Sequence, residues 1–381
     1  MSVQLAFAVL SIVIMLAKAA PAQLVAVEPE QAGPDFAFQG EYAGKSESGG
    51  KTAGQSLPVE TDFAAQVIAL GGGNFRVVFF QGGLPGAGWD GQRRYEAVGT
   101  LSQGTLDISG DEYHGTLRAD SMTGATEGGD PFRLVKLTRG SPSLGMAPPP
   151  GATVLFGTGG LEAWDNASVD GRGFFSPLEP FATTRKFYAD FSLHLEFRQP
   201  FMPFAVSQSR GNSGLKFLDE DQVSVELQIL DSFGSATGLE ECGALEGIYP
   251  PNLIASFPPL AWQTFDIQLV TTPPVDSSGA GKPRITVWQN GILIQADREF
   301  PMASGAVALA LQQYNESVFF RNIWLVEGNA RYPFFPGAAI RERRRTASGG
   351  HSLQSPAFSV RKIWMCPGQG GNYLSNGSRV P

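Results

Sequence analysis

The fold is best approached from residues 223–232, which read Val-Ser-Val-Glu-Leu-Gln-Ile-Leu-Asp-Ser. The alternation places Val225 and Leu227 on one face of an extended strand and Glu226 and Gln228 on the other. The pattern predicts an antiparallel strand with an apolar back and a polar front. A carboxylate beside an amide suits sugar hydroxyls, which both donate and accept hydrogen bonds. A solvated sheet face would show the same pattern, so both interpretations stay open at this point.

The same alternation recurs through the second half of the chain and predicts its architecture. Asn290-Gly291 lies between two β-rich runs, which is typical of a two-residue hairpin. About ten predicted strands without a helical pattern indicate two sheets packed face to face. We therefore predict a jelly-roll β-sandwich over residues 152–328.

The first half of the chain predicts a smaller all-β domain over residues 35–139. Short apolar runs alternate there with glycine-rich turns, a pattern typical of an antiparallel meander or small barrel. No site is evident in this domain. Residues 140–151, Gly-Ser-Pro-Ser-Leu-Gly-Met-Ala-Pro-Pro-Pro-Gly, predict a stiff linker and a domain boundary.

The two ends of the chain differ from both domains. Residues 1–22 contain an apolar run followed by small-residue cleavage sites, so we expect a signal peptide and a periplasmic or secreted protein. An uncleaved membrane anchor is the alternative. Residues 329–381 carry many Arg, Ser, Gly and Pro residues without periodicity and predict a basic, disordered tail.

The composition excludes several classes of partner and site. A formal net charge of −8 argues against a nucleic-acid partner, and no segment beyond the signal peptide indicates a membrane. Cys242 and Cys366 lie far apart in sequence, so we expect two free thiols. The three histidines are scattered and predict no zinc cluster. Nothing in the sequence indicates the oligomeric state.

Several stretches of the second domain match a known family. They include residues 190–198, 210–214, 225–232, 258–267, 287–291 and 320–324. Through these stretches the domain resembles the 3-keto-disaccharide hydrolase domain family, known as DUF1080, with its concanavalin/LamG-like sandwich. This resemblance implies an enzyme that cleaves 3-keto-disaccharides or other 3-keto-glycosides by elimination and hydration.

The resemblance, with the polar strand faces, implies a set of site residues. Glu226 is the candidate base or metal ligand, and Tyr314 and Arg321 complete the catalytic candidates. A divalent cation at Glu226 is an option, although no cofactor is evident from the sequence. The candidate substrate-binding residues, for an oligosaccharide or keto-glycoside, are Arg198, Arg210, Asn212, Gln228, Trp288 and Gln312.

One departure from the family leaves a second function open. The family reads Leu-Gln-x-His-Gly where this chain reads Leu-Gln-Gln-Tyr-Asn at residues 311–315, so Tyr314 replaces the histidine. A tyrosine hydroxyl is a poor base near neutral pH. A hydrolase is favoured, and a non-catalytic carbohydrate-binding module is the alternative. His194 lies on the polar face with Glu196, and we expect it to be exposed and without a role.

Overall fold

The computed structural model describes residues 24–49, 58–157, 160–272, 281–314 and 318–328, and the backbone of 341–344. Within these ranges the only helices are three 3-10 turns, η1 (Pro29–Gln31), η2 (Pro34–Ala37) and η3 (Ser207–Ser209). The prediction of an all-β protein is confirmed. None of the described helices is long and apolar enough to cross a membrane. The expected signal peptide and Cys366 lie outside the described residues.

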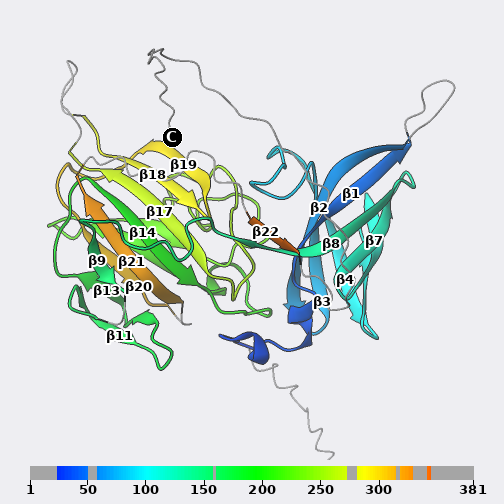
Figure 1. The fold of residues 1–381 in the computed structure, drawn as a ribbon, viewed down its shortest axis with the longest axis horizontal. Coiled ribbons are helices and arrows are strands. Elements are labelled where there is room, and N and C mark those ends of the chain that lie inside the picture. Colours follow the sequence, from blue (N-terminus) through cyan, green and yellow to red (C-terminus); the bar gives the residue numbers. More distant parts are fainter. Residues whose placement is uncertain are drawn as a thin grey trace, which may run out of the picture. The chain divides into compact units, whose positions relative to one another are not determined.

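The first domain is a closed antiparallel barrel, drawn from blue to cyan-green in Figure 1. Each strand pairs with the next, and the last pairs back to the first. The predicted small barrel is therefore confirmed, with one additional strand, β7, whose sequence Ser-Met-Thr-Gly-Ala-Thr carries little apolar signal. The barrel strands are β1 (Gly40–Gly49), β2 (Pro58–Gly71), β3 (Asn74–Gln81), β4 (Arg94–Ser102), β5 (Thr105–Ser109), β6 (Tyr113–Arg118), β7 (Ser121–Thr126) and β8 (Pro131–Gly140).

The second domain is the predicted β-sandwich, and its two sheets are built from strands that alternate along the chain. The five-stranded sheet has the order β10 (Trp164–Asp165), β13 (Phe181–Thr184), β20 (Ala308–Gln312), β15 (Ser213–Leu218) and β16 (Ser224–Ile229). The other, here called the eight-stranded sheet, has the order β11 (Ala167–Val169), β12 (Phe175–Pro177), β21 (Phe319–Glu327), β14 (Phe191–Arg198), β17 (Gln263–Val270), β18 (Arg284–Gln289) and β19 (Ile292–Glu299), with β9 (Thr153–Phe156) beside β21.

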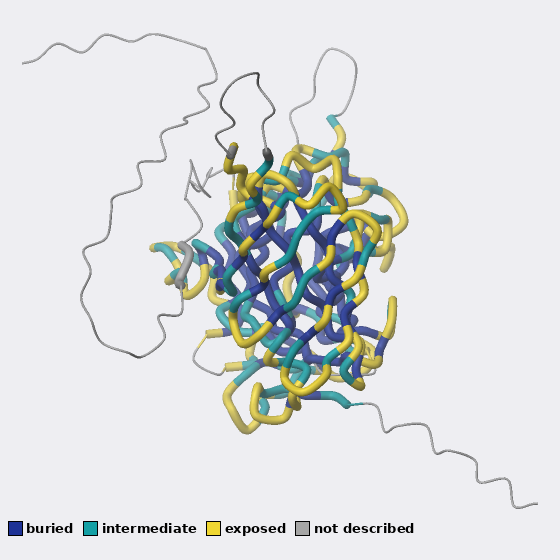
Figure 2. The backbone as a smooth tube through the Cα atoms, turned by 90° about the vertical axis from the view of Figure 1, so that its right-hand side faces the viewer, coloured by how far each residue is buried: buried dark blue, intermediate teal, exposed yellow. Residues whose placement is uncertain are grey.

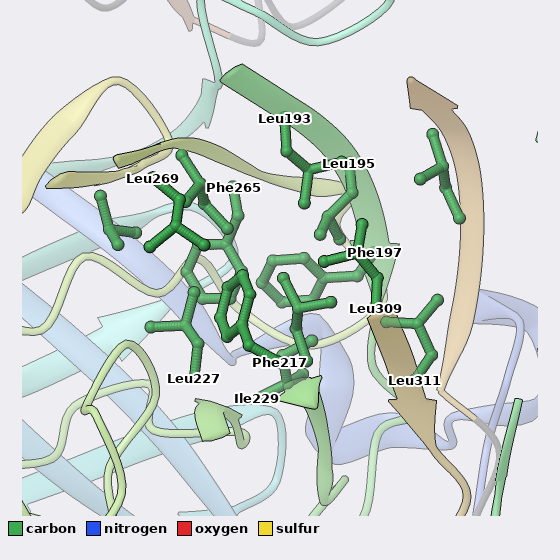
Figure 3. Close-up of a cluster of buried hydrophobic side chains, with 14 of the residues drawn as sticks. Leu193, Leu195, Phe197, Phe217, Leu227, Ile229, Phe265, Leu269, Leu309 and Leu311 are labelled. Carbon is green, nitrogen blue, oxygen red and sulfur yellow. The ribbon is translucent and has the colours of Figure 1, made fainter. Parts of the chain in front are cut away.

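The apolar faces of the two sheets meet in one core. Figure 3 shows Leu195 and Phe197 of β14 facing Phe217 of β15 and Leu227 and Ile229 of β16. Fully burying one such side chain contributes about 1.5–3 kcal/mol, so the alternation strongly determines which face of each strand points inward. Buried stretches of the backbone lie in the interior, and exposed stretches lie mostly at the periphery (Figure 2). The polar residues of each sheet therefore lie on its outer face.

Residues 141–146, the first half of the segment predicted as a linker, pack against the sandwich. Oγ of Ser141 lies 2.6 Å from Oγ1 of Thr264 on β17, and the side-chain amide of Asn322 on β21 donates to the carbonyl of Met146. Residues 141–146, here called the covering segment, therefore lie over the outer face of the eight-stranded sheet. A Ser- and Gly-rich stretch can do this because its hydroxyl and backbone groups satisfy buried polar side chains.

The predicted disordered tail lies outside the described residues, apart from the backbone of 341–344. Backbone residues Arg341–Arg344 form β22, which pairs antiparallel with β8 from Leu137 to Gly140. Strand β1 pairs with β8 only as far as Leu137, so the end of β8 extends beyond the closed barrel. Its free edge can accept a further strand through backbone hydrogen bonds, which require no particular side-chain pattern.

Candidate functional site

The outer face of the five-stranded sheet gathers the strongest candidate residues. The register of β15 and β16 sets Lys216 opposite Glu226 and Gly214 opposite Gln228. Strand β20 brings Ala310 opposite Lys216. We call this surface the Glu226 face. Its floor combines one ion pair with an amide and two very small residues.

Glu226 is paired with a lysine that the sequence analysis did not identify. Nζ of Lys216 donates to Oε2 of Glu226, and the Glu226 side chain is only 7 % exposed. Burial raises the pKa of Glu226, and Glu246 raises it further, while the ammonium of Lys216 opposes both. The net shift is upward, so this carboxyl group keeps its proton to higher pH than an ordinary glutamate. A carboxyl group that holds its proton more tightly than usual is a candidate for proton transfer.

Lys216 could have been found from the sequence. It stands two residues after Gly214 on the strand next to Glu226, so the period of two places it on the same face. The register of the two strands makes the pair, and only the structure provides that register.

Gly214 provides the space that the Glu226 carboxylate occupies. A Cβ atom at this position would lie 1.8 Å from Oε1 of Glu226 and 2.5 Å from its Cδ. The φ angle of Gly214 is not positive, so steric space rather than backbone conformation requires glycine here.

Asn212 and Gln228 form a small amide network at one end of the face. Both donate to Oε1 of Gln208, at 2.9 Å from Asn212 and 3.1 Å from Gln228. Oδ1 of Asn212 is buried and has no hydrogen-bond partner among the described residues. A buried acceptor left unpaired costs about 1–3 kcal/mol. A ligand hydroxyl that donates to it would remove this cost.

Arg210, Gln312 and Tyr314 lie around the same end of the sheet. Nε of Arg210 donates to Asp231 at 2.6 Å, which ties the turn before β15 to the end of β16. Gln312 ends β20, and its carbonyl accepts from Oγ of Ser213. Tyr314 is 38 % exposed and lines an open hollow with Glu179 and Gln313. Arg210 therefore supports the backbone of the site, while Tyr314 remains accessible.

Three of the candidate residues lie on the other sheet. Arg198 and Arg321 belong to β14 and β21, and Trp288 of β18 lies opposite Asp266 of β17. Nε of Arg321 donates to Glu196 at 2.7 Å, and its guanidinium lies 4.0 Å from the ring centroid of Trp262. Since these residues project from the opposite face of the sandwich, the grouping of Arg198, Arg321 and Trp288 with Glu226 is corrected.

His194 is buried, so its expected exposure is also corrected. Its Nδ1 lies 2.6 Å from Oδ1 of Asp266, and its ring stacks on Trp324. Burial alone would lower its pKa, but the hydrogen bonds with Asp266 and Glu196 outweigh burial and raise the pKa to about 9. Oγ of Ser143 in the covering segment donates to Asp266 at 2.6 Å. This histidine stabilises a covered network and cannot replace a missing catalytic histidine.

Cys242 is a free, fully buried thiol, and burial raises its pKa to about 11. In the parts of the chain that the structure describes, no three or more His, Cys, Asp or Glu side chains are grouped so that they could hold a metal ion.

Comparison with known proteins finds a family model that matches the sandwich. Residues 151–326 match the model of the 3-keto-alpha-glucoside-1,2-lyase-like domain. One similar solved structure, from Parabacteroides distasonis ATCC 8503, is assigned as a glycosyl hydrolase. It is 27 % identical, with 50 % of this chain and 90 % of that chain covered and a TM-score of 0.42. A second from the same organism is 22 % identical, with 46 % and 98 % covered and a TM-score of 0.36. No curated protein matches the chain.

Proposed function

We propose that this protein cleaves the glycosidic bond of 3-keto-glycosides, because residues 151–326 match the family model of the 3-keto-alpha-glucoside-1,2-lyase-like domain. The family match supports a glycoside-related function. The assignment to 3-keto-glycosides is our proposal. One observation carries it. Glu226, a buried carboxyl with a raised pKa, is paired with Lys216 beside the unpartnered Oδ1 of Asn212. A proton carrier, a cation and a hydroxyl acceptor are thus available on one face.

The proposed reaction begins with removal of the C2 proton by the Glu226 carboxylate. The electron pair of the C2–H bond moves into the ketone at C3 and forms an enolate, whose charge the Lys216 ammonium stabilises. The enolate then re-forms the ketone, and its C2–C3 electron pair forms a C1–C2 double bond as the bond between C1 and the leaving oxygen breaks. The leaving oxygen keeps that bond's electron pair and takes up a proton. Water adds to C1 and a proton returns to C2, so the net result is hydrolysis.

The other residues of the face have supporting roles in this proposal. Asn212 and Gln228 bind sugar hydroxyls, with Gln208 holding both amides in position. Tyr314 is accessible and supplies the proton to the leaving oxygen, a task that suits a phenol better than proton removal does.

Isotope incorporation tests the proposal directly. The purified protein is incubated in D2O with a 3-keto-disaccharide, and the released keto sugar is examined by NMR. We expect release of sugar with deuterium at C2, because the proton returned there comes from solvent. The same disaccharide without the keto group is the control and should stay intact. Release without deuterium at C2 would exclude elimination, and no release would exclude the hydrolase.

A divalent cation does not fit the donors around Glu226. The nearest charged partner of the carboxylate is the Lys216 ammonium, and the neighbouring amides already bond to one another. We therefore assign no step to a metal ion. Activity that survives treatment with a chelator is the expected result.

A carbohydrate-binding module remains the second candidate, because Tyr314 replaces the family histidine on an accessible position. In that case calorimetry should detect binding of keto-glycosides without release of sugar. Comparing the protein with its Tyr314→His variant separates the two. A gain of activity from none favours a module that has lost its chemistry, whereas activity in the unmodified chain favours the enzyme.

A further inference from the structure

A cavity of about 230 Å³ is lined by none of the residues that form the Glu226 face. Its walls come from β2, β3 and residues 85–94 of the barrel and from residues 235–237 and 252–254 of the sandwich. Phe80 and Ile254 are buried at its floor, whereas Ala236 and Thr237 are exposed at its rim. The cavity is therefore open to solvent on one side and apolar at its base.

Trp89 forms an aromatic wall of this cavity. Its ring packs edge-on against Phe80, with centroids 5.1 Å apart, and its indole nitrogen donates to the carbonyl of Arg93 at 2.9 Å. These contacts fix the ring, yet it remains only partly buried. A fixed, partly uncovered indole is a suitable surface for the C–H face of a sugar ring.

Polar groups surround the aromatic wall. Nη2 of Arg94 donates to the carbonyl of Gly234 at 2.8 Å and to Glu96 at 2.7 Å, so the guanidinium is held in position and its charge is balanced. Gln66 contributes a buried amide, and Asn252 an exposed one. This mixture of donors and acceptors, with a neutralised charge, matches a neutral polyhydroxylated ligand better than an anion.

We propose that this cavity binds one neutral hexopyranose unit of a glycan, as a second carbohydrate site independent of the Glu226 face. The volume limits the ligand to about one ring, since pockets for larger ligands span roughly 300–1,000 Å³. A ligand of this size binds weakly, with a Kd on the order of millimolar. The site would hold a glycan on the protein without taking part in bond cleavage.

Ligand-observed NMR and calorimetry on the full chain test this proposal. The probes are the methyl glycosides of D-glucose, D-galactose and D-mannose, with D-glucuronate as the anionic comparison. Ala236→Trp fills the cavity from its exposed rim without removing a core side chain. Its matched control is Thr100→Trp, at an exposed position of β4 that does not line the cavity.

We expect at least one glycoside to bind, with affinity reduced about tenfold or more by Ala236→Trp and by Trp89→Ala. Trp89→Phe should retain most of the binding because it keeps an aromatic face. Thr100→Trp and Glu226→Gln should leave it unchanged. No binding of any glycoside, binding unaffected by Ala236→Trp, or tighter binding of glucuronate would each overturn the proposal.

Discussion

The strands of both sheets of the sandwich alternate polar and apolar residues, but their polar outer faces differ. One face leaves a polar group unpaired, and the other is covered by a segment of the chain. Glu226 and Gln228 lie on one face, and His194 and Glu196 lie on the other. On the Glu226 face an acceptor stays unpaired among the described residues. On the other, the covering segment donates from Ser143 to Asp266 and from the backbone of Gly145 to Glu196. Polar alternation locates a face, and the segment above it decides whether that face can bind a ligand.

The pKa values of Glu196 and Glu226 differ in the same way as the two faces. Burial would raise the pKa of Glu196, but hydrogen bonds from His194, Asn322 and the Gly145 backbone outweigh it and lower the pKa to about 2. Burial raises the pKa of Glu226, whose lysine partner does not compensate. Glu196 is therefore a permanent anion inside a structural network, and Glu226 is the one of the two that can exchange a proton.

The largest expected effect is loss of catalysis in Glu226→Gln. Glutamine keeps an oxygen for Lys216 but cannot take a proton, so kcat for a 3-keto-glycoside should fall about 10²–10⁴-fold. The melting temperature should change little. Steady-state kinetics and thermal unfolding check both. Activity near that of the unmodified protein would remove Glu226 from the mechanism and with it the functional contrast between the faces.

The largest effect on stability is expected from Asp266→Ala on the covered face. This change leaves His194 without the carboxylate that holds its charge, and breaking a buried pair costs about 3–5 kcal/mol. Denaturant unfolding should show the loss, while kcat of the folded protein is retained. The matched control is Asp62→Ala, which breaks a surface pair with Lys45 and should have a far smaller effect. Equal effects of the two changes would contradict the structural role of the covered network.

The free energy of unfolding should depend on pH through two groups of the covered face, His194 and Glu196. The folded pKa of His194, about 9, is above its ordinary 6.5, so its contribution is full below pH 6.5 and is lost as the pH rises through about 9. The folded pKa of Glu196, about 2, is below 4.5, so its contribution is full above pH 4.5 and is lost as the pH falls through about 2.

The network should therefore stabilise the protein most between about pH 4.5 and 6.5. Melting temperatures measured at pH 5.5 and 9.5 should differ less in His194→Gln than in the unmodified chain, because the variant has no imidazole to titrate. An unchanged difference would show that other groups govern the alkaline loss of stability.

The sequence predicted the strands and their inward faces because a period of two survives in almost every strand. It therefore grouped Asn212, Glu226 and Gln228, and in the structure Glu226 and Gln228 lie on neighbouring positions of β16 while Asn212 and Gln228 share Gln208 as a hydrogen-bond partner. It could not assign Arg198 or Arg321 to a sheet, because strands such as β14 and β21 find their neighbours through pairings distant in sequence. The covering segment also escaped prediction. Its Ser, Gly and Pro residues are typical of a loop, and only the buried partners beneath it reveal its role.

The smallest of these effects is expected from Gly214→Ala, which tests the position of the Glu226 carboxylate. The added Cβ would overlap Oε1 of Glu226, so the carboxylate must move and its contact with Lys216 must loosen. The backbone at Gly214 accepts alanine, and a displaced base lowers kcat by about tenfold, less than removal of its charge does. Gly171→Ala, where nothing lies within 4 Å of the new atom, is the control. If both variants kept full activity, the position of the carboxylate over Gly214 would not matter for catalysis, and the small residues of this face would serve only to pack the sheet.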